Sequence, residues 1–264
     1  MTRQFVLLAC LSATNLWAAD VNPEEVIRKF AAKESEFLTA REQYTYRQSV
    51  KIEEMDSGGN PHGKYELISD IIFSADKKRS ERVVRAPVST LQNILLTPQD
   101  EQDLRNVQPF VLNSSDIAKY DVKYLRKENA DEIPCYLFSV KPKTLVKGER
   151  YFEGQIWVDD RDFQIVKTFG QGVGYEKKNS NNRFPKFETY RQQIDGKYWF
   201  PVYTHADDVL QFQDAPQRIR MTVKYQNYKK FGAESTITFG DEVKDSEKPV
   251  LPPSTPPTSQ PKPK

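Results

Sequence analysis

The chain has 264 residues, with 39 Lys or Arg against 37 Asp or Glu, so its formal net charge is only +2. This mixed charge offers no basic patch for nucleic acid, and a 29% share of charged residues indicates a well-solvated surface. Aromatic residues reach 12%, a high share for a chain with three Met, two Cys and two His, and they recur in strand-like runs.

Residues 1–19 are typical of a secretory signal peptide. Arg3 supplies the positive start, residues 5–11 form a short apolar run, and Ala18 and Ala19 supply the small residues of a cleavage point. The run is shorter than the roughly 20 apolar residues of a membrane helix, so we expect export and no transmembrane span. Two alternatives remain open: a buried N-terminal helix, or lipidation at Cys10, because residues 7–10 resemble a bacterial lipobox.

Cleavage after residue 19 leaves Cys135 as a single thiol, which cannot form an internal disulfide. The fold must then be stable through its core alone. Since Cys135 lies in an apolar strand, residues 133–140, we expect a buried small side chain and no catalytic thiol.

A helix is predicted over Pro23–Arg41. Asn22 can cap it, Pro23 fits its first position, and Glu25 completes a pattern like a capping box. The apolar residues that share one face at helical spacing are Ile27, Phe30, Phe37 and Leu38. We expect this face to dock on a sheet.

Ten segments have the composition and alternation of strands. They are residues 44–53, 64–73, 80–85, 120–126, 133–141, 154–158, 163–168, 187–194, 197–204 and 218–228. Consecutive short connections favour antiparallel pairing, and the Asp195–Gly196 pair is a hairpin signal. Between the third and fourth segments, residues 88–96 predict a short helix and residues 97–100 the cap and first turn of another, with apolar residues 110–112 beyond. This insert would cover the open face of the sheet.

The stretch GQIWVDDRDFQIVKTFG, residues 154–170, is the most informative hairpin. Ile156 and Val158 share one side before an acidic turn, and Phe163, Ile165 and Phe169 share one side after it. Residues 133–140 and 198–203 are apolar on both sides, which indicates either a sheet covered on both faces or a curved sheet whose concave side holds helices and a cavity. The fold class expected is α+β, mainly antiparallel β: a half-closed β-barrel of about ten strands with an N-terminal helix and a short helical insert as lid. One domain would span residues 20–245.

The sequence contains few groups arranged for chemistry, so we expect no enzyme, no cofactor and no metal. His62 lies in a predicted turn, and His205, in a predicted loop, precedes Asp207 and Asp208 without a second His or Cys ligand. There is no G-x-S-x-G motif, and the glycine-rich residues 170–174 lack the lysine of a P-loop. The acidic turn at 159–162 lacks the glycine and terminal glutamate of a calcium loop. An unrecognised site at His205, Asp207 and Asp208 is the alternative.

Residues 246–264 are dominated by proline, with KPVLPPSTPPTSQPKPK from Lys248 onward. Such a segment is expected to be disordered or extended. It is either a solubilising tail or a tether to a protein partner in the envelope.

Taken together, these features resemble the outer-membrane lipoprotein carrier superfamily, with its LolA/LolB-like fold. The resemblance lies in the export signal before a single amphipathic helix, the strand meander with its helical insert, the acidic-turn hairpin, and the strand YWFPVY, residues 198–203, after an Asp–Gly turn. It implies a half-closed barrel whose apolar concave side takes acyl chains or hydrophobic protein segments. It also implies, for the carriers proper, an interior arginine bound to the lid; the sequence assigns no residue to that role. Relatives on this fold act as envelope-stress sensors or lipid transporters, so the fold alone does not fix the function.

The hypothesis is therefore an exported protein of the bacterial envelope, periplasmic or otherwise secreted, that binds lipid or lipoprotein acyl chains in an apolar cavity. Each candidate lining residue could instead simply pack the core. The alternative function is a protein-interaction or envelope-stress sensor module on the same fold. The candidate ligand-binding residues are Tyr46, Tyr65, Leu67, Tyr124, Tyr136, Phe138, Ile156, Phe200 and Tyr225.

Overall fold

The computed structural model describes residues 22–73, 78–97, 100–101, 104, 110–174, 184–212 and 215–230. All of them belong to the unit Met1–Phe231. The predicted signal peptide and the proline-rich tail lie outside the described residues.

The N-terminal helix α1 spans Pro23–Arg41, as predicted. The Asn22 side chain accepts a hydrogen bond from the Glu25 backbone N–H at 3.2 Å, and Pro23 occupies the first turn, where its missing N–H costs nothing. One side of the helix is buried, and it contains a carboxylate among apolar residues: Val26, Phe30, Ala31, Glu34, Phe37 and Ala40. Ile27 and Leu38, expected on this face, are only partly buried.

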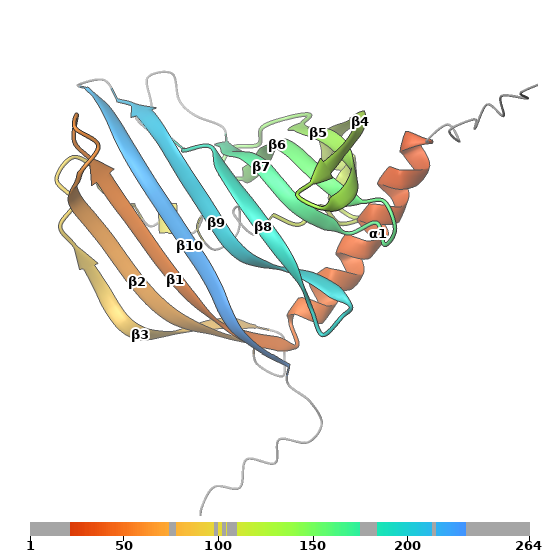
Figure 1. Ribbon diagram of the computed structural model, residues 1–264, viewed down its shortest axis with the longest axis horizontal. Helices are drawn as coiled ribbons and strands as arrows, with labels where there is room; N and C mark the ends of the chain where they lie inside the picture. Colours follow the sequence, from red (N-terminus) through yellow and green to blue (C-terminus); the bar gives the residue numbers. More distant parts are fainter. Residues whose placement is uncertain are drawn as a thin grey trace, which may run out of the picture. The chain divides into compact units, whose positions relative to one another are not determined.

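Ten antiparallel strands form one sheet (Figure 1). They are β1 Tyr44–Met55, β2 Pro61–Phe73, β3 Arg79–Ser89, β4 Tyr120–Ala130, β5 Ile133–Pro142, β6 Arg150–Asp159, β7 Ile165–Gly174, β8 Phe187–Ile194, β9 Tyr198–Gln211 and β10 Pro216–Lys230.

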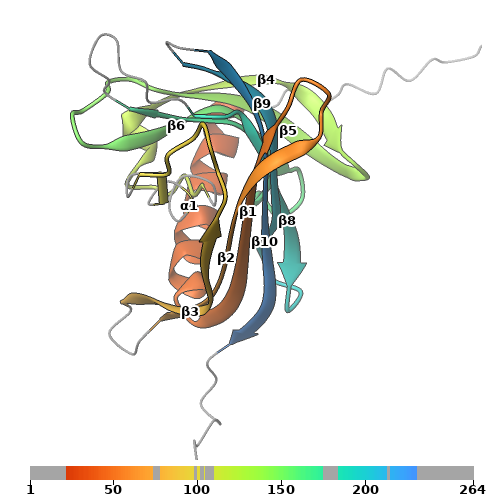
Figure 2. The same cartoon turned by 90° about the vertical axis from the view of Figure 1, so that its left-hand side faces the viewer.

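The order across the sheet is β3-β2-β1-β10-β9-β8-β7-β6-β5-β4. The first and last strands of the chain are therefore neighbours inside the sheet, while β3 and β4 form its two edges. Because the edges are not hydrogen-bonded to each other, the barrel is only half closed, which confirms the predicted fold class. Figure 2 shows α1 alongside the inner face of the curled sheet.

The main core cluster lies between this inner face, α1 and the segment that links β3 to β4. A smaller cluster on the opposite face contains Cys135, Leu137 and Trp157, with Trp199 packed against it. Because successive strand residues point to opposite faces, β5 supplies Phe138 to the inner cluster and Leu137 to the outer one. This explains why residues 133–140 are apolar on both sides. Burial raises the pKa of Cys135 to about 12, in line with an unreactive thiol.

The predicted acidic turn is confirmed, but one side-chain direction beyond it is wrong. Asp159 and Asp162 accept hydrogen bonds from the backbone N–H groups of Arg161 and Gln164, at 2.7 and 2.9 Å. A bulge opposite Trp157 and Val158 then shifts the register of β7. Phe169 therefore lies on the outer face, 37% exposed, although Ile165 lies in the inner core.

The helix predicted over 88–96 is wrong. Val88 and Ser89 end β3, where they pair with Glu66 and Tyr65, and residues 90–97 contain no helix. The next predicted cap is confirmed, since the Thr97 hydroxyl accepts from the Asp100 N–H at 3.2 Å and the Asp100 carboxylate accepts from the Thr97 N–H at 2.8 Å. His205 is also misplaced by the prediction: it lies within β9.

Candidate functional site

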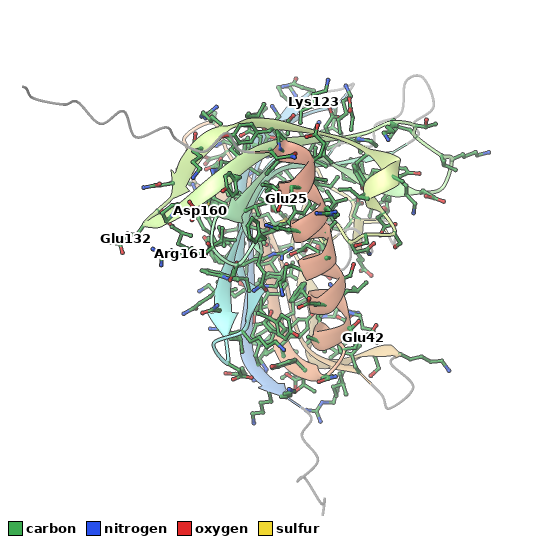
Figure 3. All side chains as sticks on the ribbon, turned by 90° about the vertical axis from the view of Figure 1, so that its right-hand side faces the viewer. Glu25, Glu42, Lys123, Glu132, Asp160 and Arg161 are labelled. Carbon is green, nitrogen blue, oxygen red and sulfur yellow. The ribbon has the colours of Figure 1, made fainter. Side chains whose placement is uncertain are left out.

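The segment between β3 and β4 crosses the inner face of the sheet, and we call residues 90–119 the cover. Residues 90–97, 100–101, 104 and 110–119 of it are described, and they end in the 3-10 helix η1, Ile117–Lys119. Its apolar side chains enter or border the main core cluster: Leu91, Leu96, Leu104, Phe110, Leu112 and Ile117. Together with α1, whose two ends are marked by Glu25 and Glu42 in Figure 3, the cover fills the hollow side of the sheet.

Eight of the nine candidate residues belong to the main core cluster or border it. Five are buried members of the main cluster, namely Tyr46, Tyr65, Phe138, Ile156 and Tyr225. Three border it and are partly buried, namely Leu67, Tyr124 and Tyr136. Phe200 lies apart, in a small cluster with Phe37 and Tyr44 near the end of α1. That these residues contact a ligand stays a prediction.

Rings on the sheet and on its coverings contact one another directly. Phe30 of α1 lies 5.5 Å from Phe138 of β5, measured between ring centroids. Phe110 of the cover stacks on Phe152 of β6, with centroids 4.3 Å apart. The Phe152 ring in turn lies over Gly154 and Gly170, whose added Cβ atoms would approach its Cζ to 2.9 and 2.7 Å. Two glycines opposite each other therefore make the space that lets the cover dock.

One end of the cover is bound by a buried ion pair, which we call the Arg191 anchor. Arg191 of β8 donates from Nη1 to Glu34 Oε1 at 2.9 Å and from Nη2 to Glu34 Oε2 at 3.2 Å. Its Nη2 also donates to the backbone carbonyl of Phe110. Glu34 is fully buried, and the Arg191 side chain is 1% exposed. One guanidinium thus joins the sheet, α1 and the cover.

Nothing in the sequence prediction identified this anchor. A signal was present, because Glu34 falls between Phe30 and Phe37 on the apolar side of the helix, and Arg191 alternates with Thr189 and Phe187 on the inward side of a strand. Two opposite charges, each on the buried side of an otherwise apolar element, indicate a buried ion pair. Because the two residues are 157 positions apart, the sequence does not show that they pair with each other until the fold is known.

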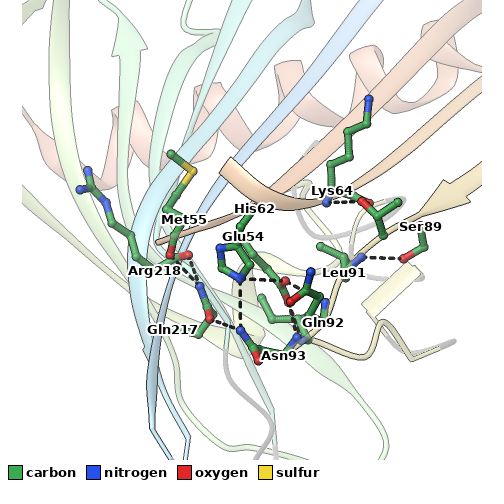
Figure 4. Close-up of polar contacts among 12 residues, drawn as sticks. Glu54, Met55, His62, Lys64, Ser89, Leu91, Gln92, Asn93, Gln217 and Arg218 are labelled. Atoms are coloured by element: carbon green, nitrogen blue, oxygen red, sulfur yellow. Dashed lines mark hydrogen bonds and ion pairs between the residues drawn. The ribbon is translucent and has the colours of Figure 1, made fainter. Parts of the chain in front are cut away.

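The other end of the cover is held by a second buried carboxylate, which we call the Glu54 anchor (Figure 4). Glu54 of β1 is fully buried and accepts backbone N–H groups from Gln92 at 2.8 Å, Asn93 at 2.8 Å and Ile94 at 2.6 Å. His62 Nε2 lies 3.5 Å from Glu54 Oε2. These bonds replace the helical bonds that residues 92–94 were expected to make.

Two details show how closely the Glu54 anchor is fitted. A Cβ atom on Gly63 would lie 2.5 Å from Glu54 Oε2 and 2.9 Å from the Thr90 carbonyl, so only glycine leaves room for both. The Asn93 side chain donates to Gln217 Oε1 at 2.9 Å, and Gln217 donates to the Met55 carbonyl at 3.1 Å. The anchor therefore connects the cover to β1, β2 and β10.

Weaker contacts hold the cover at two other points. The Ser35 hydroxyl of α1 lies 3.2 Å from the Ser114 hydroxyl and accepts the Ser114 N–H at 3.0 Å. Gln48 of β1 donates to the Leu104 carbonyl at 3.4 Å. Apart from backbone hydrogen bonds at its two ends, from the Thr90 N–H to the Lys64 carbonyl at 2.7 Å and from the Lys143 N–H to the Lys119 carbonyl at 2.9 Å, the described part of the cover is attached through side chains.

The residues of the alternative enzyme site do not converge. His205 stacks on Tyr203, Asp207 accepts from Arg218 at 2.8 Å, and Asp208 accepts the backbone N–H of Lys186 at 2.9 Å. The Arg218 hydrogen bond lowers the pKa of Asp207. The described part of the chain holds no group of three His, Cys, Asp or Glu side chains that could bind a metal. It also holds no helix long and apolar enough to cross a membrane.

A shallow hollow of about 500 Å³ lies on β4–β7 away from the cover. Its lining includes Lys123, Lys141, Lys186, Glu153 and Phe169, and none of the nine candidate residues. Its open position and mixed charge distinguish it from the apolar inner face.

No protein-family model and no curated protein matches the sequence. Several solved structures are similar. A DUF1329 family protein from Desulfovibrio piger has 15% identity and a TM-score of 0.39, with 81% of this chain and 96% of that chain covered. A LolA superfamily protein from Nitrosomonas europaea has 13% identity and a TM-score of 0.31, with 75% and 93% covered. The MucA/MucB complex of Pseudomonas aeruginosa gives 10% identity and a TM-score of 0.21, with 76% and 100% covered.

The LolA superfamily, to which one of these structures belongs, is the group that the sequence resembles. Identities and TM-scores this low transfer no function to the present chain.

Proposed function

We propose that this chain is an exported protein of the bacterial envelope that binds lipid or lipoprotein acyl chains between the inner face of its sheet and its cover. The observation that carries the proposal is a large apolar inner face closed by a segment that is attached at separate polar anchors. A segment attached in this way can be displaced without breaking the sheet.

An acyl chain would take the place of apolar side chains of the cover. Leu91, Leu104, Phe110 and Leu112 now cover the aromatic floor of the sheet. Burial of a methylene group stabilises by about 0.8 kcal/mol, so a chain of several methylenes offsets the exposure of one or two of these side chains. Binding would thus replace contacts between the cover and the sheet with contacts between the acyl chain and the sheet. The hydrogen bonds at the displaced anchor would be lost.

Arg191 supports the proposal in a second way. The resemblance implies an interior arginine bound to the lid, and Arg191 is an interior arginine that binds both α1 and the cover. Its bond to the Phe110 carbonyl involves a backbone atom, so it holds the position of the cover without depending on the side chain there.

The alternative function, a protein-interaction or envelope-stress sensor module, is favoured by the edge strand β3. Val83, Val84 and Val88 are 48–52% exposed, and the outer edge of β3 has no partner strand among the described residues. An extended peptide can add to such an edge through backbone hydrogen bonds. Pro87 and two register shifts protect this edge, which limits the length that can pair. Pull-down with and without residues 248–264 tests whether a partner instead needs the tail.

The lipid hypothesis is tested by native mass spectrometry of the purified protein, followed by titration of the lipid-free protein with a fluorescent fatty acid. We expect co-purified lipid or saturable binding of one molecule per chain. Tyr124→Ala and Tyr136→Ala, at the margin of the inner cluster, should weaken binding, whereas Val209→Ala on an exposed outer position should not. Absence of both co-purified lipid and fatty-acid binding would contradict the proposal.

A further inference from the structure

The end of α1 carries more buried positive charge than negative charge. Glu34 and Arg191 neutralise each other through two hydrogen bonds. Arg41, seven residues after Glu34 and therefore on the same side of the helix, is a second guanidinium in this region. The groups that act on it electrostatically are Tyr46, Arg191, Tyr228 and Glu34, so the only carboxylate among them is already bound to Arg191.

The charge of Arg41 is not paired within the part of the chain that the structure describes. Its Nε is buried without a hydrogen bond, and its guanidinium makes no ion pair with the described residues. Burial lowers the pKa of Arg41, and the like charge of Arg191 acts in the same direction. Buried charges in proteins are ordinarily paired, because an unpaired one loses its hydration without compensation. The residue as a whole is half-buried, which leaves part of its surface open to solvent.

Aromatic side chains connect Arg41 to the main core cluster. The Tyr46 and Tyr228 rings lie 5.1 Å apart, and Tyr46 and Tyr225 lie 6.1 Å apart. The Tyr228 hydroxyl donates to the Pro201 carbonyl at 2.6 Å, whereas Tyr46 is held by ring contacts. The Tyr46 hydroxyl makes no hydrogen bond to the described residues, so it can serve as a second donor to an anion at Arg41, and Tyr46 and Tyr225 belong to the apolar inner face.

We propose that Arg41, assisted by the Tyr46 hydroxyl, binds an anionic oxygen group, a carboxylate or a phosphate, at the head of an amphiphile whose apolar chain follows Tyr46 and Tyr225 onto the inner face. This inference rests on the proposed function and adds the class of ligand: an anionic amphiphile. A guanidinium is suited to this role because its planar N–H groups match the geometry of both carboxylate and phosphate.

A purely structural role for Arg41 makes a different prediction. Arginine in the last turn of a helix interacts favourably with the carbonyl end of the helix dipole. If that were its function, Arg41→Gln would lower the melting temperature of the free protein. If Arg41 instead serves to bind an anion, Arg41→Gln removes an unpaired charge from the free protein, and its melting temperature stays equal or rises.

The experiment compares oleate, lysophosphatidate and neutral oleyl alcohol as ligands, at a pH where both anions are ionised, with inorganic phosphate as a fourth arm. Arg41→Gln is matched by Arg28→Gln, which makes the same change at an exposed position of the same helix. We expect the unmodified protein to prefer the anionic amphiphiles over oleyl alcohol by about tenfold or more, which is 1.4 kcal/mol. Arg41→Gln should abolish this preference, and Arg28→Gln should keep it.

The outcomes separate this inference from the proposed function. Equal binding of oleate and oleyl alcohol, or an unchanged preference in Arg41→Gln, overturns the headgroup site and leaves lipid binding standing. If phosphate binds to the unmodified protein but not to Arg41→Gln, while no amphiphile binds, the anion site is supported and lipid binding is contradicted. If no anion binds in any arm, the site is overturned.

Discussion

Each of the two anchors of the cover contains a fully buried glutamate, but the two carboxylates are satisfied in different ways. Glu34 is neutralised by Arg191, a side chain of the sheet, so neither partner of this ion pair belongs to the cover. Glu54 is satisfied mainly by three backbone N–H groups of the cover itself. Lifting the cover at Phe110 therefore loses one hydrogen bond from Arg191, whereas lifting it at residues 92–94 leaves a buried carboxylate without its donors.

This difference predicts the direction in which the cover opens. The end near Phe110 and Ser114 should separate first, and the Glu54 anchor should act as the fixed end. The Glu34–Arg191 pair would then keep α1 joined to the sheet while the cover is open, and the bond from Arg191 to the Phe110 carbonyl would break.

The largest effect is expected when the buried pair is broken. Arg191→Met leaves Glu34 buried without a cation and should lower the free energy of unfolding by about 3–5 kcal/mol in urea denaturation. The double variant Glu34→Leu with Arg191→Met should recover most of that loss, since a well-packed apolar pair replaces the ions. Additive losses in the double variant would show that the two side chains do not act as a pair.

A smaller effect is expected at the other anchor. In Glu54→Gln, an amide NH₂ replaces one of the accepting oxygens, so at least one of the three N–H groups loses its acceptor and stability falls by about 1–3 kcal/mol. Hydrogen exchange should accelerate at residues 92–94 and stay unchanged at residues 110–119. Equal acceleration at both ends would mean that the cover behaves as one unit, without a fixed end.

The cover is also where prediction from sequence failed. The bounds of α1 and the presence of all ten strands followed from apolar periodicity, and the Thr97–Asp100 cap followed from local side-chain chemistry. Such signals are local, and the sequence displays them directly. Residues 88–96 have apolar spacing that suits a helix, but Val88 extends β3 and Glu54 captures the backbone N–H groups of residues 92–94.

Both anchors depend on contacts between residues far apart in the chain. Glu54 is 38 to 40 positions from its donors, and Glu34 is 157 positions from Arg191. The inward direction of eight candidate residues followed from strand alternation, but Phe200 joined another cluster because the end of α1 covers it. The direction of the Phe169 side chain was predicted wrongly because a bulge shifts the register of β7, and strand alternation alone does not reveal a bulge.

A still smaller effect is expected at His62, beside the Glu54 anchor. Its side chain is 29% exposed and lies 3.5 Å from Glu54, so its contribution is limited by solvent. His62→Gln should change the free energy of unfolding by about 0–1 kcal/mol. A loss as large as that of Glu54→Gln would mean that the histidine, and not the backbone amides, satisfies the carboxylate.

A pH titration gives a contrast with the buried anchors. Hydrogen bonds from Arg47 and Arg82 lower the pKa of Asp70, on β2, to about 2 from its usual 3.8. A lowered carboxyl pKa stabilises the fold above pH 3.8, and this contribution is lost as the pH falls toward 2. Asp70→Asn should therefore flatten part of the acid limb of a stability-against-pH curve, without affecting exchange at residues 92–94.

The central claim, that the cover must separate from α1 to admit an acyl chain, is tested most directly by a reversible lock. Ser35→Cys with Ser114→Cys replaces two hydroxyls that lie 3.2 Å apart with thiols that can form a disulfide across the end predicted to open. Cys135 should not interfere, because it is buried and its pKa is raised to about 12. Ser49→Cys with Lys224→Cys, at paired positions of β1 and β10 whose neighbours Val50 and Val223 face the inner core, is the control on the outer face.

The quantity to measure is the affinity for a fluorescent fatty acid in the oxidised and the reduced protein. Binding should be lost when the 35–114 pair is oxidised and restored by reductant, while the control pair binds in both states. Undiminished binding by the fully oxidised 35–114 protein would contradict the claim.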